Sequence, residues 1–166
     1  MAAEAEVLDE LHRLRARVPQ LTGALAAGVD GLVLAQDTPG VEAEGLAALT
    51  AAALGVALRT ADATGRGDFR ELLVRGEHGY VATYAAGPSV VLTLLADDRA
   101  NVGRLHLEGR RSGARIGELV EAATEAAAEA QPTPAARPSP KPTAPAPRTR
   151  TPRAARTVTG PAGESH

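Results

Sequence analysis

The stretch Val18–Gln36, which reads VPQLTGALAAGVDGLVLAQ, decides the fold. It holds two apolar runs, Leu21–Val29 and Leu32–Gln36, joined by Asp30-Gly31. Asp-Gly between hydrophobic runs predicts a β-hairpin, because the primed hairpin turns need positive φ, which Gly and Asp tolerate. We therefore expect two antiparallel strands over about 22–29 and 32–36, with a tight turn at Asp30-Gly31.

A helix precedes this hairpin, over about residues 4–17. Its apolar side chains are four, three and four residues apart, which puts Val7, Leu11, Leu14 and Val18 on one stripe of a helix. Val18-Pro19 ends the helix, because proline disfavours the α conformation at the residue before it.

A second helix is expected over about residues 42–62, and it is rich in alanine. One stripe holds Leu46, Leu49, Ala53 and Val56, while alanines cover the other faces. A helix that is apolar almost all round is usually buried on more than one side. Its own sheet accounts for one side, and a second copy of the chain is the economical cover for the other.

Three more strands and a third helix complete the order, at about 69–75, 80–85, 89–96 and 100–130. The strand over 89–96 contains VVLTLL, and such continuous hydrophobicity predicts a central strand covered on both faces. The strand over 69–75 carries Arg70, Glu71 and Arg75, as expected of an edge. This order predicts an α+β domain with one antiparallel sheet.

The composition divides the chain near Gln131. Residues 132–166 hold nine of the 12 prolines and carry a net charge of +5, whereas residues 1–131 carry −7. We expect a domain over 1–131 and a disordered, partly polyproline II tail over 132–166. An acidic folded part disfavours a nucleic-acid partner. The absence of cysteine, of a signal-like N-terminus and of a long uninterrupted apolar run predicts a cytoplasmic protein without membrane insertion.

No set of residues predicts an active site. Asp97-Asp98 is best explained as a strand-to-helix loop, and the four histidines (His12, His78, His106 and His166) do not share metal-ligand spacing. Gly65-Arg66-Gly67 lacks the phosphate-loop pattern, and Gly67 is expected to supply positive φ in a turn. Gly109, Gly113 and Gly117 predict close approach of the third helix to another element. We therefore expect no enzymatic activity, no cofactor and no metal.

Three segments together resemble the roadblock/light-chain-seven family. They are the first helix leading through Val18-Pro19 into the hairpin, the small-residue second helix, and the junction Asp97–Leu105 with its Asn101-Val102-Gly103 step. The resemblance covers about residues 4–120. Longin and profilin-like folds share the sheet and remain alternatives at the level of fold.

The resemblance implies a five-stranded sheet of order 2-1-5-4-3, with one helix on one face and two on the other. It also implies dimerisation through the third strand and second helix, and a small Ras-like GTPase as partner in bacterial signalling. We expect a non-enzymatic homodimeric regulator or adaptor of such a GTPase. The alternative is a structural scaffold for other signalling proteins, with the tail as a peptide bait.

The residues predicted for these contacts lie on the second helix and the third strand. Leu49 and Ala52 are candidates for the dimer contact, and Leu72 and Val74 for the strand edge. The polar candidates for reading a partner are Glu42, Glu44, Thr50 and Arg59.

Overall fold

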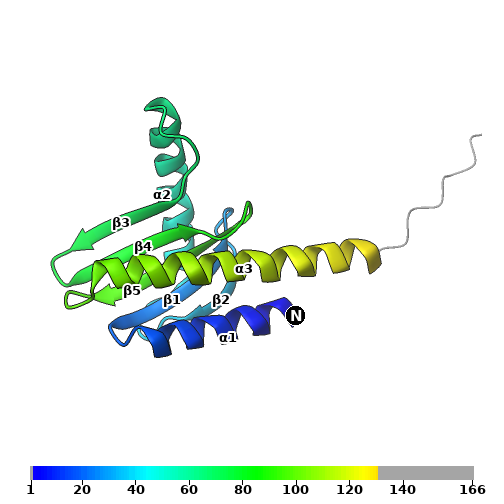
Figure 1. Ribbon diagram of the computed structural model, residues 1–166, viewed down its shortest axis with the longest axis horizontal. Helices are drawn as coiled ribbons and strands as arrows, with labels where there is room; N and C mark the ends of the chain where they lie inside the picture. The colour runs from blue at the N-terminus through cyan, green and yellow to red at the C-terminus, as the bar shows by residue number, and fades with distance from the viewer. Residues whose placement is uncertain (1, 131–166) are drawn as a thin grey trace, which may run out of the picture. The chain divides into compact units, whose positions relative to one another are not determined.

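The computed structural model describes residues 2–130 (Figure 1). The predicted tail over 132–166 therefore lies outside the described residues. The elements follow the predicted order: α1 (Ala2–Arg17), β1 (Leu21–Gly28), β2 (Val33–Asp37), α2 (Ala43–Ala63), β3 (Glu71–Gly76), β4 (Gly79–Ala85), β5 (Val90–Asp97) and α3 (Val102–Ala130).

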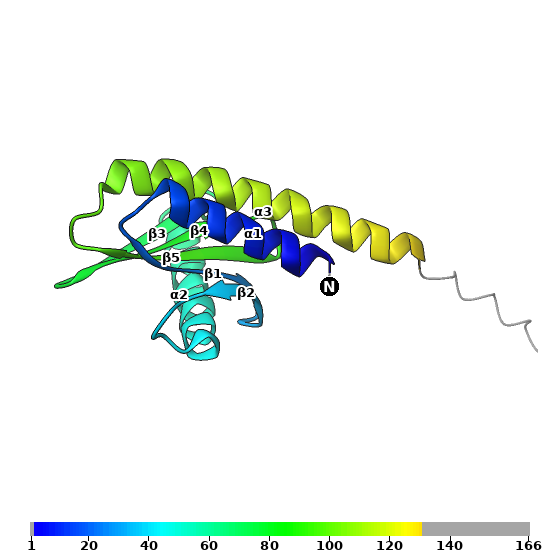
Figure 2. The same cartoon turned by 90° about the horizontal axis from the view of Figure 1, so that it is seen from below.

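The five strands form one antiparallel sheet of order β2-β1-β5-β4-β3, as predicted. β5 is central and β3 is an edge. Helices α1 and α3 cover one face of the sheet and α2 covers the other (Figure 2). The predicted α+β architecture is confirmed.

The main core lies between the sheet and the α1–α3 layer. Val7, Leu11 and Leu14 of α1 are fully buried there, together with Leu105 and Ile116 of α3. The helical spacing of the apolar residues in α1 is therefore what seats it on the sheet. A smaller cluster on the other face is formed by side chains of β1 and α2: Leu25, Ala27, Ala43 and Ala47.

The β1–β2 hairpin differs from the tight primed turn predicted for Asp30-Gly31. β1 ends at Gly28, and the Gly31 amide donates to the Gly28 carbonyl at 2.9 Å. Gly31 has φ +86° and the Gly28 amide donates to the Leu32 carbonyl, which makes a three-residue loop. Leu32, predicted in the strand, closes this loop and is exposed, and β2 begins at Val33.

Capping residues fix two boundaries that periodicity alone does not give. The Asn101 side chain accepts from the Arg104 amide at 2.9 Å, so α3 begins at Val102 rather than at residue 100. After α2, the Gly65 amide donates to Asp62 and the Arg66 amide to Ala61, a Schellman arrangement with Gly65 at φ +65°. Gly67 has φ +80°, as predicted for this turn.

The glycine stripe of α3 is a close-approach surface, as predicted. A Cβ at Gly109 would overlap the Tyr84 ring, one at Gly113 would lie 3.1 Å from the Ala85 carbonyl oxygen, and one at Gly117 would lie 3.0 Å from the Gly87 amide. The three glycines therefore let α3 lie directly on β4 and the turn that follows it.

Candidate interaction surface

Helix α2 rests on the sheet through small residues. Its buried residues are Ala43, Ala47, Thr50 and Leu54, spaced four, three and four residues apart. Thr50, predicted as a contact for a partner, is 5% exposed, and its hydroxyl lies 3.2 Å from that of Thr93, which in turn lies 3.2 Å from that of Thr83. That prediction is wrong for this protomer, because Thr50 is used to seat α2 on the sheet.

The larger apolar side chains of α2 point away from the core. Leu49 is 70% exposed and Val56 is 68% exposed. They lie seven residues apart, two helical turns, and therefore occupy the same side of α2. Ala52, also predicted for the dimer contact, is exposed between them. Since a Leu or Val side chain gains about 1.5–3 kcal/mol on full burial, this surface favours contact with another apolar surface.

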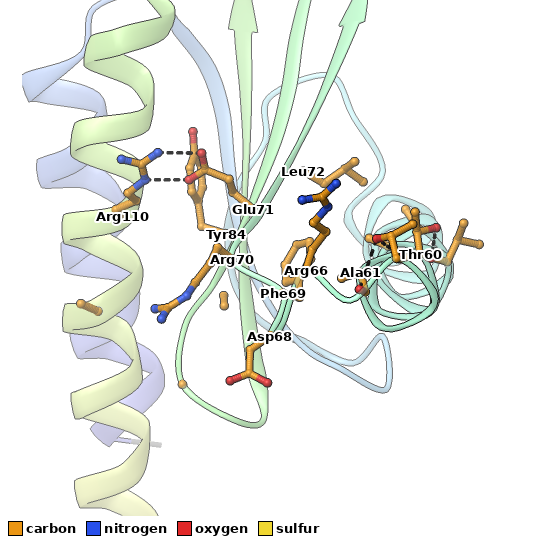
Figure 3. A pocket seen from close by; sticks show the side chains of 17 residues that line it. Thr60, Ala61, Arg66, Asp68, Phe69, Arg70, Glu71, Leu72, Tyr84 and Arg110 are labelled. Carbon is orange, nitrogen blue, oxygen red and sulfur yellow. Dashed lines mark hydrogen bonds and ion pairs between the residues drawn. The ribbon is translucent and has the colours of Figure 1, made fainter.

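Edge strand β3 lies beside this surface. Leu72 is half-buried and Val74 is 50% exposed, and β3 pairs with β4 on one side only. An open groove of about 1260 Å³ runs from α2 past the start of β3 to α3. In Figure 3, Phe69 and Leu72 face α2 across this groove, whereas Arg70 and Glu71 lie toward α3. Sequence reasoning missed the groove, because its walls come from three separate segments.

The polar candidates on α2 have different roles. The Glu42 carboxylate accepts from the amides of Glu44 at 2.9 Å and Gly45 at 2.6 Å, so it caps the helix. Glu44 and Arg59 are exposed, and the Glu44 side chain lies against the Glu42 carboxyl, whose pKa it lowers. Of the four polar candidates, Arg59 is the one whose side chain makes no hydrogen bond or ion pair within residues 2–130.

A cluster of polar side chains joins β3 to α3 at the far wall of the groove. Arg110 binds Glu71 through two hydrogen bonds of 2.7 Å (Figure 3). The His106 Nδ1 atom lies 3.1 Å from the Tyr84 hydroxyl. The hydrogen bonds from Arg110 hold the pKa of the Glu71 carboxyl below its ordinary value. Burial raises the pKa of the Tyr84 phenol. The cluster is therefore an ion-pair contact in which Arg110 occupies both carboxylate oxygens of Glu71.

The remaining sequence candidates are not brought together. Asp97 accepts from the Arg99 amide in the loop before α3, as a strand-to-helix loop should. Within residues 2–130, no group of three His, Asp or Glu side chains is placed to hold a metal ion. His166 lies outside the described residues.

Helix α2 is long and apolar enough to cross a membrane by length and composition, and it is the one such helix among residues 2–130. The core helix of a soluble protein passes the same test. Here one face of α2 is seated on the sheet through the buried residues described above. The exposed side chains of Leu49 and Val56 add to the hydropathy of α2 but take no part in its contact with the sheet.

Comparisons with known proteins agree with this architecture. The sequence profile of the Roadblock/LC7 domain matches residues 7–96. Two uncharacterized proteins of Methanocaldococcus jannaschii are each 36% identical over 111 residues, which is 66% of this chain and 93% of theirs. The chain therefore belongs to the Roadblock/LC7 domain family.

Solved structures share the fold at lower identity. The gliding protein MglB from Thermus thermophilus has a TM-score of 0.68 and 23% identity, over 74% of this chain and 93% of that one. A Roadblock/LC7 domain from Streptomyces avermitilis has a TM-score of 0.64 and 24% identity, over 69% of this chain and 97% of that one. An MglB with a tetrameric arrangement has a TM-score of 0.69 and 23% identity, over 74% and 93%.

Proposed function

We propose that this chain is a non-enzymatic, homodimeric regulator or adaptor of a small Ras-like GTPase in bacterial cytoplasmic signalling. The observation that carries the proposal is the exposed pair Leu49 and Val56 beside the open edge of β3. Family membership adds the expectation of a GTPase partner, which the geometry of a single protomer does not provide.

The dimer contact follows from two unmet needs of the protomer. Leu49 and Val56 gain free energy when they are removed from water, and the outer backbone groups of β3 need partners. A two-fold axis parallel to the sheet normal at β3 meets both, because it pairs β3 with its symmetry mate and brings the two α2 helices together. The result would be one continuous ten-stranded sheet.

The GTPase surface would be the outer face of the paired α2 helices. Glu44 and Arg59 are exposed there, and they offer charges that a switch region of the GTPase would contact. The platform would bias the GTPase by binding one of its conformations more tightly than the other. The chemical groups for GTP hydrolysis would come mainly from the GTPase itself.

The dimer is tested by static light scattering on the full chain and on substituted chains. Leu49→Glu with Val56→Glu should raise the dimer dissociation constant at least about 100-fold, because each substitution places a charge twice in an apolar contact. The matched control is Leu58→Glu, which is 46% exposed and lies nine residues from Leu49, on the opposite side of α2. A wild-type chain that is monomeric at tens of micromolar would rule out this dimer.

The partner is tested by titration calorimetry against the Ras-like GTPases of the source organism in their GDP and GTP-analogue states. We expect binding that differs between the two states and that Arg59→Glu weakens about tenfold. Equal affinity for both states would exclude regulation by population shift, since a ligand must discriminate to move an equilibrium. No binding to any of them would leave the scaffold as the better explanation.

A further inference from the structure

Helix α3 has its charges divided between its two halves. Residues 102–115 carry Arg104, Arg110, Arg111 and Arg115 with one acid, whereas residues 116–130 carry four glutamates and no basic residue. The one acid in the first half, Glu108, is paired with Arg17 at 2.8 Å. The four glutamates of the second half are Glu118, Glu121, Glu125 and Glu129.

This order of charges is not explained by the stability of the helix. Acidic side chains are favourable near a helix N-terminus and basic ones near its C-terminus, and α3 has the reverse arrangement. Contacts within the protomer explain part of it, because Arg110 binds Glu71, Arg104 donates to the Arg17 carbonyl, and Arg115 lies 3.2 Å from Glu118. Arg111, Glu121, Glu125 and Glu129 are exposed and make no hydrogen bond or ion pair within residues 2–130.

The two halves share one exposed stripe. Leu107, Arg111, Ala114, Glu118, Ala122 and Glu125 follow one another at spacings of four, three, four, four and three residues, so they lie on one side of the helix. Leu107 is 64% exposed and lies within one helical turn of Arg104 and Arg111. In both views the C-terminal end of α3 runs on beyond the sheet, so no other element of residues 2–130 covers that end (Figures 1 and 2).

We propose that this stripe of α3 binds the same stripe on a second copy of the chain, with the two helices antiparallel. A two-fold axis crossing α3 between Ala114 and Arg115 places the basic half of each helix opposite the acidic half of the other. Arg111 of each copy then lies opposite Glu118 of the other, Arg104 lies opposite Glu125, and Leu107 lies opposite Ala122, where it leaves water on both copies. A parallel arrangement is disfavoured because it places like charges together.

This contact is separate from the proposed α2–β3 dimer and does not rest on it. The two surfaces lie on opposite faces of the sheet, since α2 covers one face and α3 the other. One protomer therefore has room for both contacts, and α3 would join dimers into a larger symmetric assembly.

The test compares two charge-reversed full-length chains by sedimentation equilibrium at 50 mM salt. The acidic chain carries Arg104→Glu and Arg111→Glu, and the basic chain carries Glu118→Arg and Glu125→Arg, so that the substituted residues face each other when the chains are mixed. We expect the wild-type weight-average mass to fall about twofold in each, and to return when the two chains are mixed in equal amounts. Arg99→Glu, an exposed arginine outside the stripe, is the control and should leave the mass unchanged.

The same charge reversals are also made in the Leu49→Glu, Val56→Glu chain, in which the α2–β3 dimer is weakened. A twofold fall in mass is expected both there and in the otherwise wild-type chain, which separates the α3 contact from the α2–β3 dimer. In 1 M salt the wild-type mass should also fall, since the Debye length shortens to about 3 Å. An unchanged mass in both reversed chains, or no recovery on mixing, would overturn the proposal. A fall in the basic chain alone would also overturn it and would point to a cationic occupant, such as the chain's own basic residues 132–166.

Discussion

Glu10 is a buried carboxylate at the contact between α1 and α3. Its Oε1 atom accepts from the Arg17 Nη2 atom at 2.9 Å and from the Ser112 hydroxyl at 2.7 Å, and Arg17 also binds Glu108. Burial by itself would raise the pKa of the Glu10 carboxyl, but these hydrogen bonds outweigh it and hold the pKa below the ordinary value of 4.5. Glu10 therefore favours the folded state while it is ionised.

Replacing Glu10 by Gln should lower the free energy of unfolding by about 1–3 kcal/mol at pH 7, because a charge-assisted contact is lost. A carboxyl with a lowered folded pKa stabilises above its unfolded pKa, and this contribution disappears as pH falls through the folded value. The difference between wild type and variant should thus shrink below about pH 4.5. Urea unfolding at pH 7 and pH 3.5 measures it. A difference that is independent of pH would contradict the assigned role of Glu10.

Thr93 is the middle of three buried hydroxyls beneath α2. Thr93→Val should cost about 1–3 kcal/mol, because it leaves the Thr50 and Thr83 hydroxyls buried without their partner. Replacing all three threonines by Val should cost less than the single change, since no unpaired hydroxyl remains. Thermal unfolding of the two variants tests this order, and a larger loss in the triple variant would contradict it.

Thr50 also shows what one sequence cannot reveal at the residue scale. A threonine on an alanine-rich helix resembles a surface position. Its hydrogen-bond partner Thr93 is 43 residues away in sequence, and Thr93 in turn contacts Thr83. Glu42 has the same difficulty, because a carboxylate near a helix start serves equally as a cap or as a contact. Only the tertiary arrangement separates these roles.

At the scale of elements, the packing of α3 against β4 depends on Gly109. Gly109→Ala would gain about 1 kcal/mol from helix propensity, but its Cβ would overlap the Tyr84 ring, and such overpacking typically costs about 1–3 kcal/mol. We therefore expect net destabilisation. Gly55→Ala in α2 is the matched control, because nothing lies within 4 Å of its added Cβ, and it should stabilise. Chemical denaturation measures the free energy of unfolding of both variants. Changes of the same sign in the two variants would contradict this account.

Element order, strand order and the central position of β5 were predictable, because each depends on local periodicity or on the family resemblance. The details that failed depend on longer-range packing. In α2, the sequence predicts that Thr50 is available to a partner, yet the sheet accepts Ala47 and Thr50 and leaves Leu49 and Val56 exposed. In the hairpin, Asp30-Gly31 marks the turn, but the loop length is fixed by the bulge where Ala27 pairs with Val33.

At the scale of the whole molecule, we expect dimerisation to add to the measured stability against unfolding. A partner that binds the folded chain and not the unfolded one adds free energy in proportion to the logarithm of its concentration. For a homodimer that partner is the chain itself. The melting temperature should therefore rise with protein concentration, which a folded monomer would not show.

We expect the melting temperature to rise by a few degrees between about 2 and 200 μM chain, because a hundredfold change in concentration corresponds to about 2.7 kcal/mol per mole of dimer. The Leu49→Glu, Val56→Glu chain should show a smaller dependence and the Leu58→Glu chain the full one. Scanning calorimetry at several concentrations measures it, with 1 M salt added to weaken the α3 contact. A dependence that survives the α2 substitutions at high salt would place the dimer contact elsewhere than on Leu49 and Val56.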